Sequence, residues 1–116
     1  MAIKTVNELG YIEIADEVVA SIAGLAAIGC AGIVGMASVR ASDGLAELLK
    51  RENLARGVKV SSQGDRIVID LHVIIEYGVS MVAVANNVIE SVRYNVENMT
   101  SMAVDAVNVC IQGVRV

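Results

Sequence analysis

The segment 66–100 constrains the fold most, because a strand pattern, a break and a helix pattern follow one another in it. Apolar residues occupy every second position from Ile67 to Tyr77, while Asp70, His72 and Glu76 lie on the opposite face. This alternation predicts a strand that buries one side and leaves the other in contact with water.

A helix pattern follows the break at Gly78. Apolar residues then recur at spacings of three and four, which predicts an amphipathic helix over 79–99. The residues on its apolar face are Met81, Ala85, Val88, Ile89, Val92, Val96 and Met99.

The rest of the chain supplies further elements for the same sheet. Tyr11 to Ile14 alternates as a short strand, and two acidic residues then favour a helix start, which predicts a helix over 16–28. Its apolar face is expected to consist of Val18, Ile22 and Leu25, flanked by Val19, Ala23 and Ala26. A strand over 33–39, a helix over 43–54, a hairpin strand from Val58 with a loop over 61–65, and a final strand over 103–116 follow.

These elements predict one α+β domain. We expect a mainly antiparallel sheet of four to five strands with two to three helices, in the order β-α-β-α-β-β-α-β. A chain of 116 residues buries one core, and its 55% apolar content without Phe, Trp or Pro suits compact aliphatic packing. The domain is expected over 11–116, preceded by a flexible N-terminus over 1–10.

The uncharged stretch 18–39 is long enough to cross a bilayer. Twelve of its twenty-two residues are Ala, Gly or Ser, which favour insertion weakly, and the glycines at 29, 32 and 35 interrupt a helix. Helix, turn and buried strand is therefore the preferred interpretation over a membrane span.

The formal net charge of −4 argues against nonspecific nucleic-acid binding by the whole surface. The segment 40–66 is nevertheless net positive, and it defines a candidate basic surface patch. The residues of this patch are Arg40, Lys50, Arg51, Arg56 and Lys59. Because acidic residues are interleaved with them, a solvated helix face explains the same pattern.

No residue pattern points to catalysis, a cofactor or a metal centre. His72, the only histidine, shares a strand face with Asp70 and Glu76, and this row fits either a metal site or a solvent-facing strand. Cys30 and Cys110 are eighty positions apart, and buried free thiols are expected, with their proximity left open.

Five blocks resemble the alkaline shock protein family, the envelope stress response family of Gram-positive bacteria. They cover residues 11–18, 32–36, 57–60, 75–79 and 96–100, in the family's order and spacing. The resemblance implies a cytoplasmic, non-enzymatic protein of cell-envelope homeostasis or stress response. It also implies an oligomeric scaffold, with a membrane-anchored protein partner that holds it at the inner face of the membrane.

The residues themselves allow two mechanisms for such a protein. An edge strand or a free sheet face can pair with a second copy, which makes self-association the first hypothesis. Val68 and Ile74, on the polar face of the strand, would mark an interface if they are exposed. The alternative is a nucleic-acid-binding module that uses the basic segment 40–66, with affinity that falls as salt is added.

Overall fold

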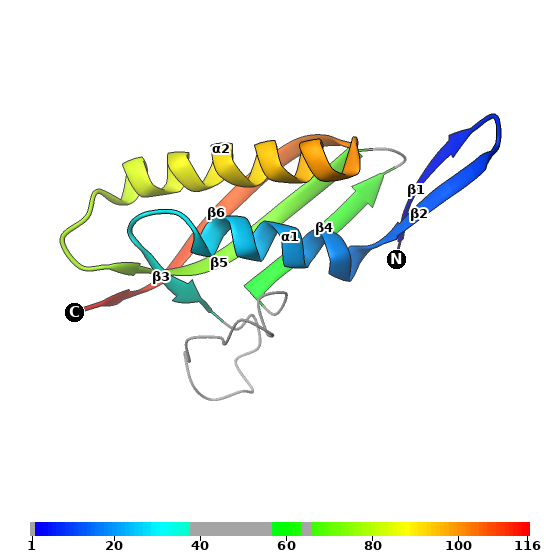
Figure 1. Ribbon diagram of the computed structural model, residues 1–116. Helices are drawn as coiled ribbons and strands as arrows, with labels where there is room; N and C mark the ends of the chain where they lie inside the picture. Colours follow the sequence, from blue (N-terminus) through cyan, green and yellow to red (C-terminus); the bar gives the residue numbers. More distant parts are fainter. Residues whose placement is uncertain (1, 38–56, 64–65) are drawn as a thin grey trace.

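The computed structural model of the protein describes residues 2–37, 57–63 and 66–116, which form the α+β domain that the sequence predicts (Figure 1). The helix expected over 43–54 lies outside this part of the chain. The elements are β1 (Ala2–Asn7), β2 (Gly10–Ala15), α1 (Asp16–Ile28), β3 (Ile33–Met36), β4 (Val58–Gln63), β5 (Arg66–Glu76), α2 (Met81–Thr100) and β6 (Ala103–Arg115).

Strand β5 is the centre of the main sheet. β4 pairs antiparallel with its first half, from Gln63 opposite Arg66 to Val58 opposite Leu71, and β3 pairs antiparallel with its last residues. On its other side β6 runs parallel to it along the whole length. The other three strand pairings in the described chain are antiparallel, so the predicted mainly antiparallel sheet is confirmed.

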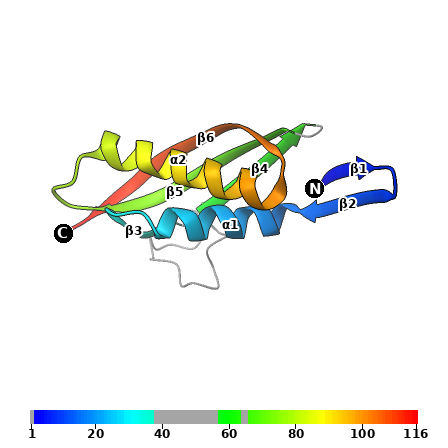
Figure 2. The ribbon, with the colours of Figure 1, turned by 45° about the horizontal axis from the view of Figure 1, so that its top comes forward.

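Both helices cover the same face of this sheet (Figures 1 and 2). α1 packs over β3 and β4, and α2 packs over β6. The period-two row of β5 provides the floor of the core beneath them, as the sequence predicts. The fully buried members of that row are Ile67, Ile69, Leu71, Val73 and Ile75.

The apolar face predicted for α1 is right at the flanking residues Val19 and Ala23, which are fully buried, but wrong at its centre. Val18 and Leu25 are about half exposed, and Ile22 is only partly buried. Mostly small residues face the sheet, because they let the helix approach the strands closely. Since α1 is apolar on most sides, apolar spacing alone does not mark the side that faces the sheet. The buried residues of α1 are Val19, Ala20, Ala23, Gly24 and Ala27.

The buried side of α2 also differs from the prediction at its ends. Met81 and Met99 are exposed, while Val84 and Thr100 are buried. The buried residues advance in steps of four, and such a row is inclined to the helix axis, so it rotates away from the predicted stripe at both ends. Tyr77, predicted on the buried row of β5, is 70% exposed because the strand ends at Glu76.

An N-terminal hairpin extends beyond the sheet. β1 pairs antiparallel with β2, from Asn7 opposite Gly10 to Ala2 opposite Ala15, and the hairpin lies past one end of the domain in both views (Figures 1 and 2). The strand predicted from Tyr11 is confirmed as β2, but the sequence analysis did not predict its partner. Flexibility of residues 1–10 remains a prediction.

The uncharged stretch from residue 18 forms most of α1, a turn and β3. This is the helix, turn and strand that the sequence analysis preferred over a membrane span. Within the described ranges, none of the helices has the length and apolar content needed to cross a bilayer.

Gly57 lies where β3 and β4 meet beside β5. A Cβ atom there would lie 2.8 Å from the carbonyl oxygen of Ala37 and 2.9 Å from Cβ of Met36. Because neither neighbour is the end of a flexible side chain, Gly57→Ala is expected to lower the free energy of unfolding by about 1–3 kcal/mol. Urea denaturation measures the change. Gly113→Ala is the matched control, with its nearest contact 3.9 Å away, and an equal loss in both variants would contradict the steric explanation.

The two cysteines lie on opposite sides of the sheet. The Cys30 thiol, in the helix layer, donates to the carbonyl oxygen of Ala26 at 3.4 Å, whereas Cys110 pairs with His72 on the face away from the helices. A disulfide needs Cα atoms within about 7 Å, so we expect no internal disulfide in the folded protein. Mass spectrometry of the monomer after mild oxidation tests this, and a loss of two hydrogens that removes both thiols would refute it.

Candidate functional site

The sheet face opposite the helices carries a polar row across three strands. Lys59 of β4 lies opposite Asp70 of β5, and Asn108 of β6 follows on the other side. The Asn108 side-chain amide donates to the Asp70 carboxylate at 2.8 Å. Opposite charges and amide hydrogen bonds across neighbouring strands stabilise a sheet. This row therefore contributes to strand pairing and register.

His72 belongs to a second polar group on the same face. Its Nδ1 lies 3.2 Å from the Gln112 side-chain nitrogen, and Cys110 is its neighbour across the strands. Among the residues that the structure describes, no three His, Cys, Asp or Glu side chains come together as a metal site. The row of Asp70, His72 and Glu76 fits the solvent-facing interpretation, with the first two engaged by β6 side chains.

The two apolar residues predicted on this face are not exposed to the extent that a patch would need. Ile74 is buried, at 6% exposure, and Val68 is half-buried. The condition under which these two residues would mark an interface is therefore not met.

Only one residue of the candidate basic patch can be placed. Lys59 is exposed on β4 and lies opposite Asp70 in the strand register. Arg40, Lys50, Arg51 and Arg56 lie outside the described residues. The patch stays a prediction.

The outer edge of β6, on the side away from β5, is another candidate surface. In the described part of the chain β6 pairs only with β5, so its outer side carries backbone groups that no described strand pairs. The register shifts at Asp105 and again at Gln112. Between the shifts lies a regular stretch, 106–111, with no charged residue.

The start of β6 is fixed to α2 and β5. The Glu97 carboxylate accepts from the backbone N–H of Val104 at 2.9 Å, and the Arg93 guanidinium donates to the carbonyl oxygen of Asp105 at 3.5 Å. Arg66 of β5 forms an ion pair with the Asp105 carboxylate. These contacts hold the first shift of register in place, so the regular stretch of the edge begins at a defined position.

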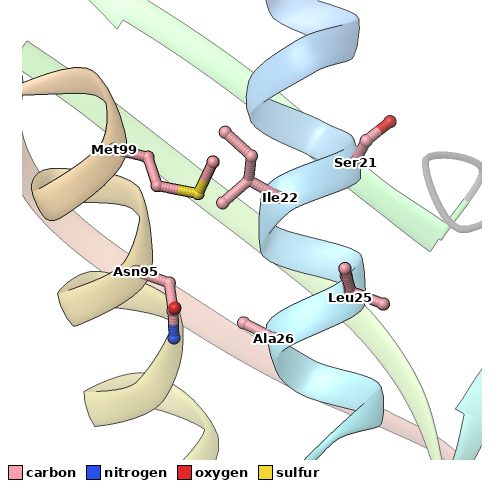
Figure 3. Close-up of a pocket in the computed structure, with 6 residues that line it drawn as sticks. All are labelled: Ser21, Ile22, Leu25, Ala26, Asn95 and Met99. Carbon is pink, nitrogen blue, oxygen red and sulfur yellow. The ribbon is translucent and has the colours of Figure 1, made fainter.

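A shallow groove of about 380 Å³ runs between the two helices on their outer side (Figure 3). Ile22 of α1 points toward Met99 of α2 across it, and Leu25 also lines the groove. The Asn95 amide in the groove donates to the carbonyl oxygen of Ser91 at 2.7 Å, so its polar group is satisfied within α2. The groove can accept an apolar side chain. The sequence analysis missed it because it placed Ile22 and Leu25 in the core.

Comparison with known proteins identifies close relatives in Gram-positive bacteria. The uncharacterized protein YloU of Bacillus subtilis is 47% identical over all of this chain and 98% of its own length. The uncharacterized protein Spy1614 of Streptococcus pyogenes is 38% identical over all of this chain and 97% of its own. YqhY of Bacillus subtilis, also uncharacterized, is 38% identical over 94% of this chain and 80% of its own. No solved structure matches.

Residues 4–116 also match one family across nearly the whole chain. The match covers the polar face, the edge of β6 and most of the hairpin, and the family's described role is a cell envelope-related function. The resemblance predicted from the five sequence blocks is thereby confirmed. The chain belongs to the alkaline shock protein 23 family.

Proposed function

We propose that this protein is a non-enzymatic assembly protein of the cell envelope that works by self-association through the free edge of β6. The observation that carries the proposal is the regular, uncharged stretch 106–111 on a strand that pairs on one side only among the described strands. Open strand edges pair readily with another chain unless charges, prolines or bulges protect them. Here the bulges flank the stretch and leave it accessible.

Apolar side chains beside this edge support pairing with a second protein chain. Val109 and Ile111 face the helix layer but are only partly buried, and Val114 further along β6 is exposed. A strand added to the edge would remove this apolar surface from water while it satisfies the open backbone groups. Each apolar side chain that becomes buried contributes at about 25 cal/mol per Å².

A membrane-anchored protein partner is the second part of the proposal. It would hold the assembly at the inner, cytoplasmic face of the membrane, where a scaffold can act in envelope homeostasis and the stress response. The family's cell envelope-related function supports this part, because such a protein has to act at or near the envelope.

The mass of the purified protein in solution tests self-association. Light scattering at increasing protein concentration is expected to show a rising mass at both low and moderate salt, because edge pairing depends on backbone hydrogen bonds and apolar burial. A constant monomer mass would refute the mechanism. An assembly that dissociates completely at moderate salt would point to charge contacts instead and would also count against it.

A lysine at the edge tests the site itself. Asn108→Lys retains a partner for the Asp70 carboxylate within the monomer, but it places on the edge a charge that pairing must desolvate. We expect the apparent dissociation constant to rise about tenfold or more, with unchanged thermal stability. Asn98→Lys, at an exposed position on α2, is the matched control. Equal association of Asn108→Lys and the wild type would rule out this edge.

A further inference from the structure

We infer that the β1–β2 hairpin is an arm that adds to the free edge of β6 in a second copy of the chain. This inference rests on the proposed function, because it names the segment that occupies the edge. The argument uses the exposure of the hairpin, its position relative to its own β6, and the match between the two sets of strands.

The side chains that the structure describes in the hairpin, those of residues 8–15, are mostly exposed. Five of the six residues of β2 are exposed, and only Ile14 is partly buried. Leu9 is fully exposed, and Tyr11 and Ile12 are 61% and 55% exposed. An isolated two-stranded hairpin is marginally stable in water. A hairpin that exposes three large apolar residues gains stability when another surface covers them.

The hairpin does not pair with β6 of its own chain, because β1 and β2 form a separate two-stranded sheet. β2 ends at Ala15 and α1 begins at Asp16, so the helix sets the direction of the hairpin without an intervening linker. α1 packs over β3 and β4, whereas β6 lies on the other side of β5. The hairpin extends past the end of the sheet in both views (Figures 1 and 2). An arm in this position contacts the edge of a different copy.

The hairpin and the edge match in length and chemistry. β1 and β2 have six residues each, and the regular stretch of β6 also has six. Strand addition uses backbone donors and acceptors along both partners, and side chains on alternating faces set its specificity. The groove between α1 and α2 can cover apolar side chains, but it has no open strand edge. It would therefore bury the exposed apolar residues of the hairpin without pairing the hairpin's backbone groups.

Disulfide trapping tests the contact directly. Tyr11→Cys and Ile12→Cys place thiols on opposite faces of β2, and each is made in a Cys30→Ser background that leaves Cys110 on β6. If the hairpin adds to β6 through β2, with residues 11 and 12 level with Cys110, one of the two variants forms a disulfide-linked dimer under mild oxidation, because Cys110 lies on one face of the sheet only. Peptide mass spectrometry must show the hairpin joined to β6. Asn98→Cys in the same background is the collision control.

Removal of the apolar contacts provides a second measurement. The double variant Tyr11→Thr/Ile12→Thr keeps residues that favour strands while it removes the exposed apolar surface. We expect the apparent dissociation constant of the assembly to rise about tenfold or more, as for loss of central contacts in an interface. Tyr94→Gln removes a similarly exposed tyrosine from α2 and is expected to leave association unchanged.

The outcomes separate this inference from the proposed function. Loss of association in both Asn108→Lys and the hairpin variant, with a trapped hairpin–β6 disulfide, supports both. Loss in Asn108→Lys alone, without the disulfide, overturns the arm and leaves edge pairing intact. Loss in the hairpin variant alone shows that the hairpin docks elsewhere and overturns both. A monomeric wild type overturns both as well.

Discussion

The structure depends on β5 being paired along both sides and buried on one face. β3, β4 and β6 all hydrogen-bond to this strand, and none of these three pairs with another among the described strands. Both helices pack on the row from Ile67 to Ile75. Loss of pairing at β5 would therefore separate every part of the main sheet at once. This explains why the clearest strand pattern in the sequence is also the centre of the fold.

Three surfaces were described above: the open face of the sheet, the groove between the helices and the edge of β6. They differ in how many of their polar groups already have hydrogen-bond partners. On the open face of the sheet, Asp70 and His72 already have hydrogen-bonding partners on β6. The groove between the helices is lined by apolar side chains, and its amide is bonded within α2. The edge of β6 and the hairpin carry both open backbone groups and exposed apolar side chains. This combination is what favours them as the places where a second chain binds.

Sequence patterns predicted where the helices and strands lie in the chain better than they predicted how these elements pack against one another. The alternation in β5 and the acidic start of α1 each follow from local physics, and both were confirmed. The side of α1 that faces the core was not predictable in this way, because Val18 and Leu25 are as apolar as the residues that are buried. The parallel pairing of β6 depends on where α2 returns the chain, which no local pattern contains. The groove and the hairpin were missed for the same reason, since both depend on how distant segments meet.

The position of β5 also imposes an order on folding. β4 ends two residues before β5 begins, so this local pair can form within microseconds, whereas β6 must wait for α2 to close a much longer loop. During that interval the central strand is itself an edge, with an apolar run that could join another unfolded chain. Asp70 and His72 interrupt that run on one face. Polar residues within such a strand act as gatekeepers against aggregation, so the polar face protects the chain before the sheet is complete.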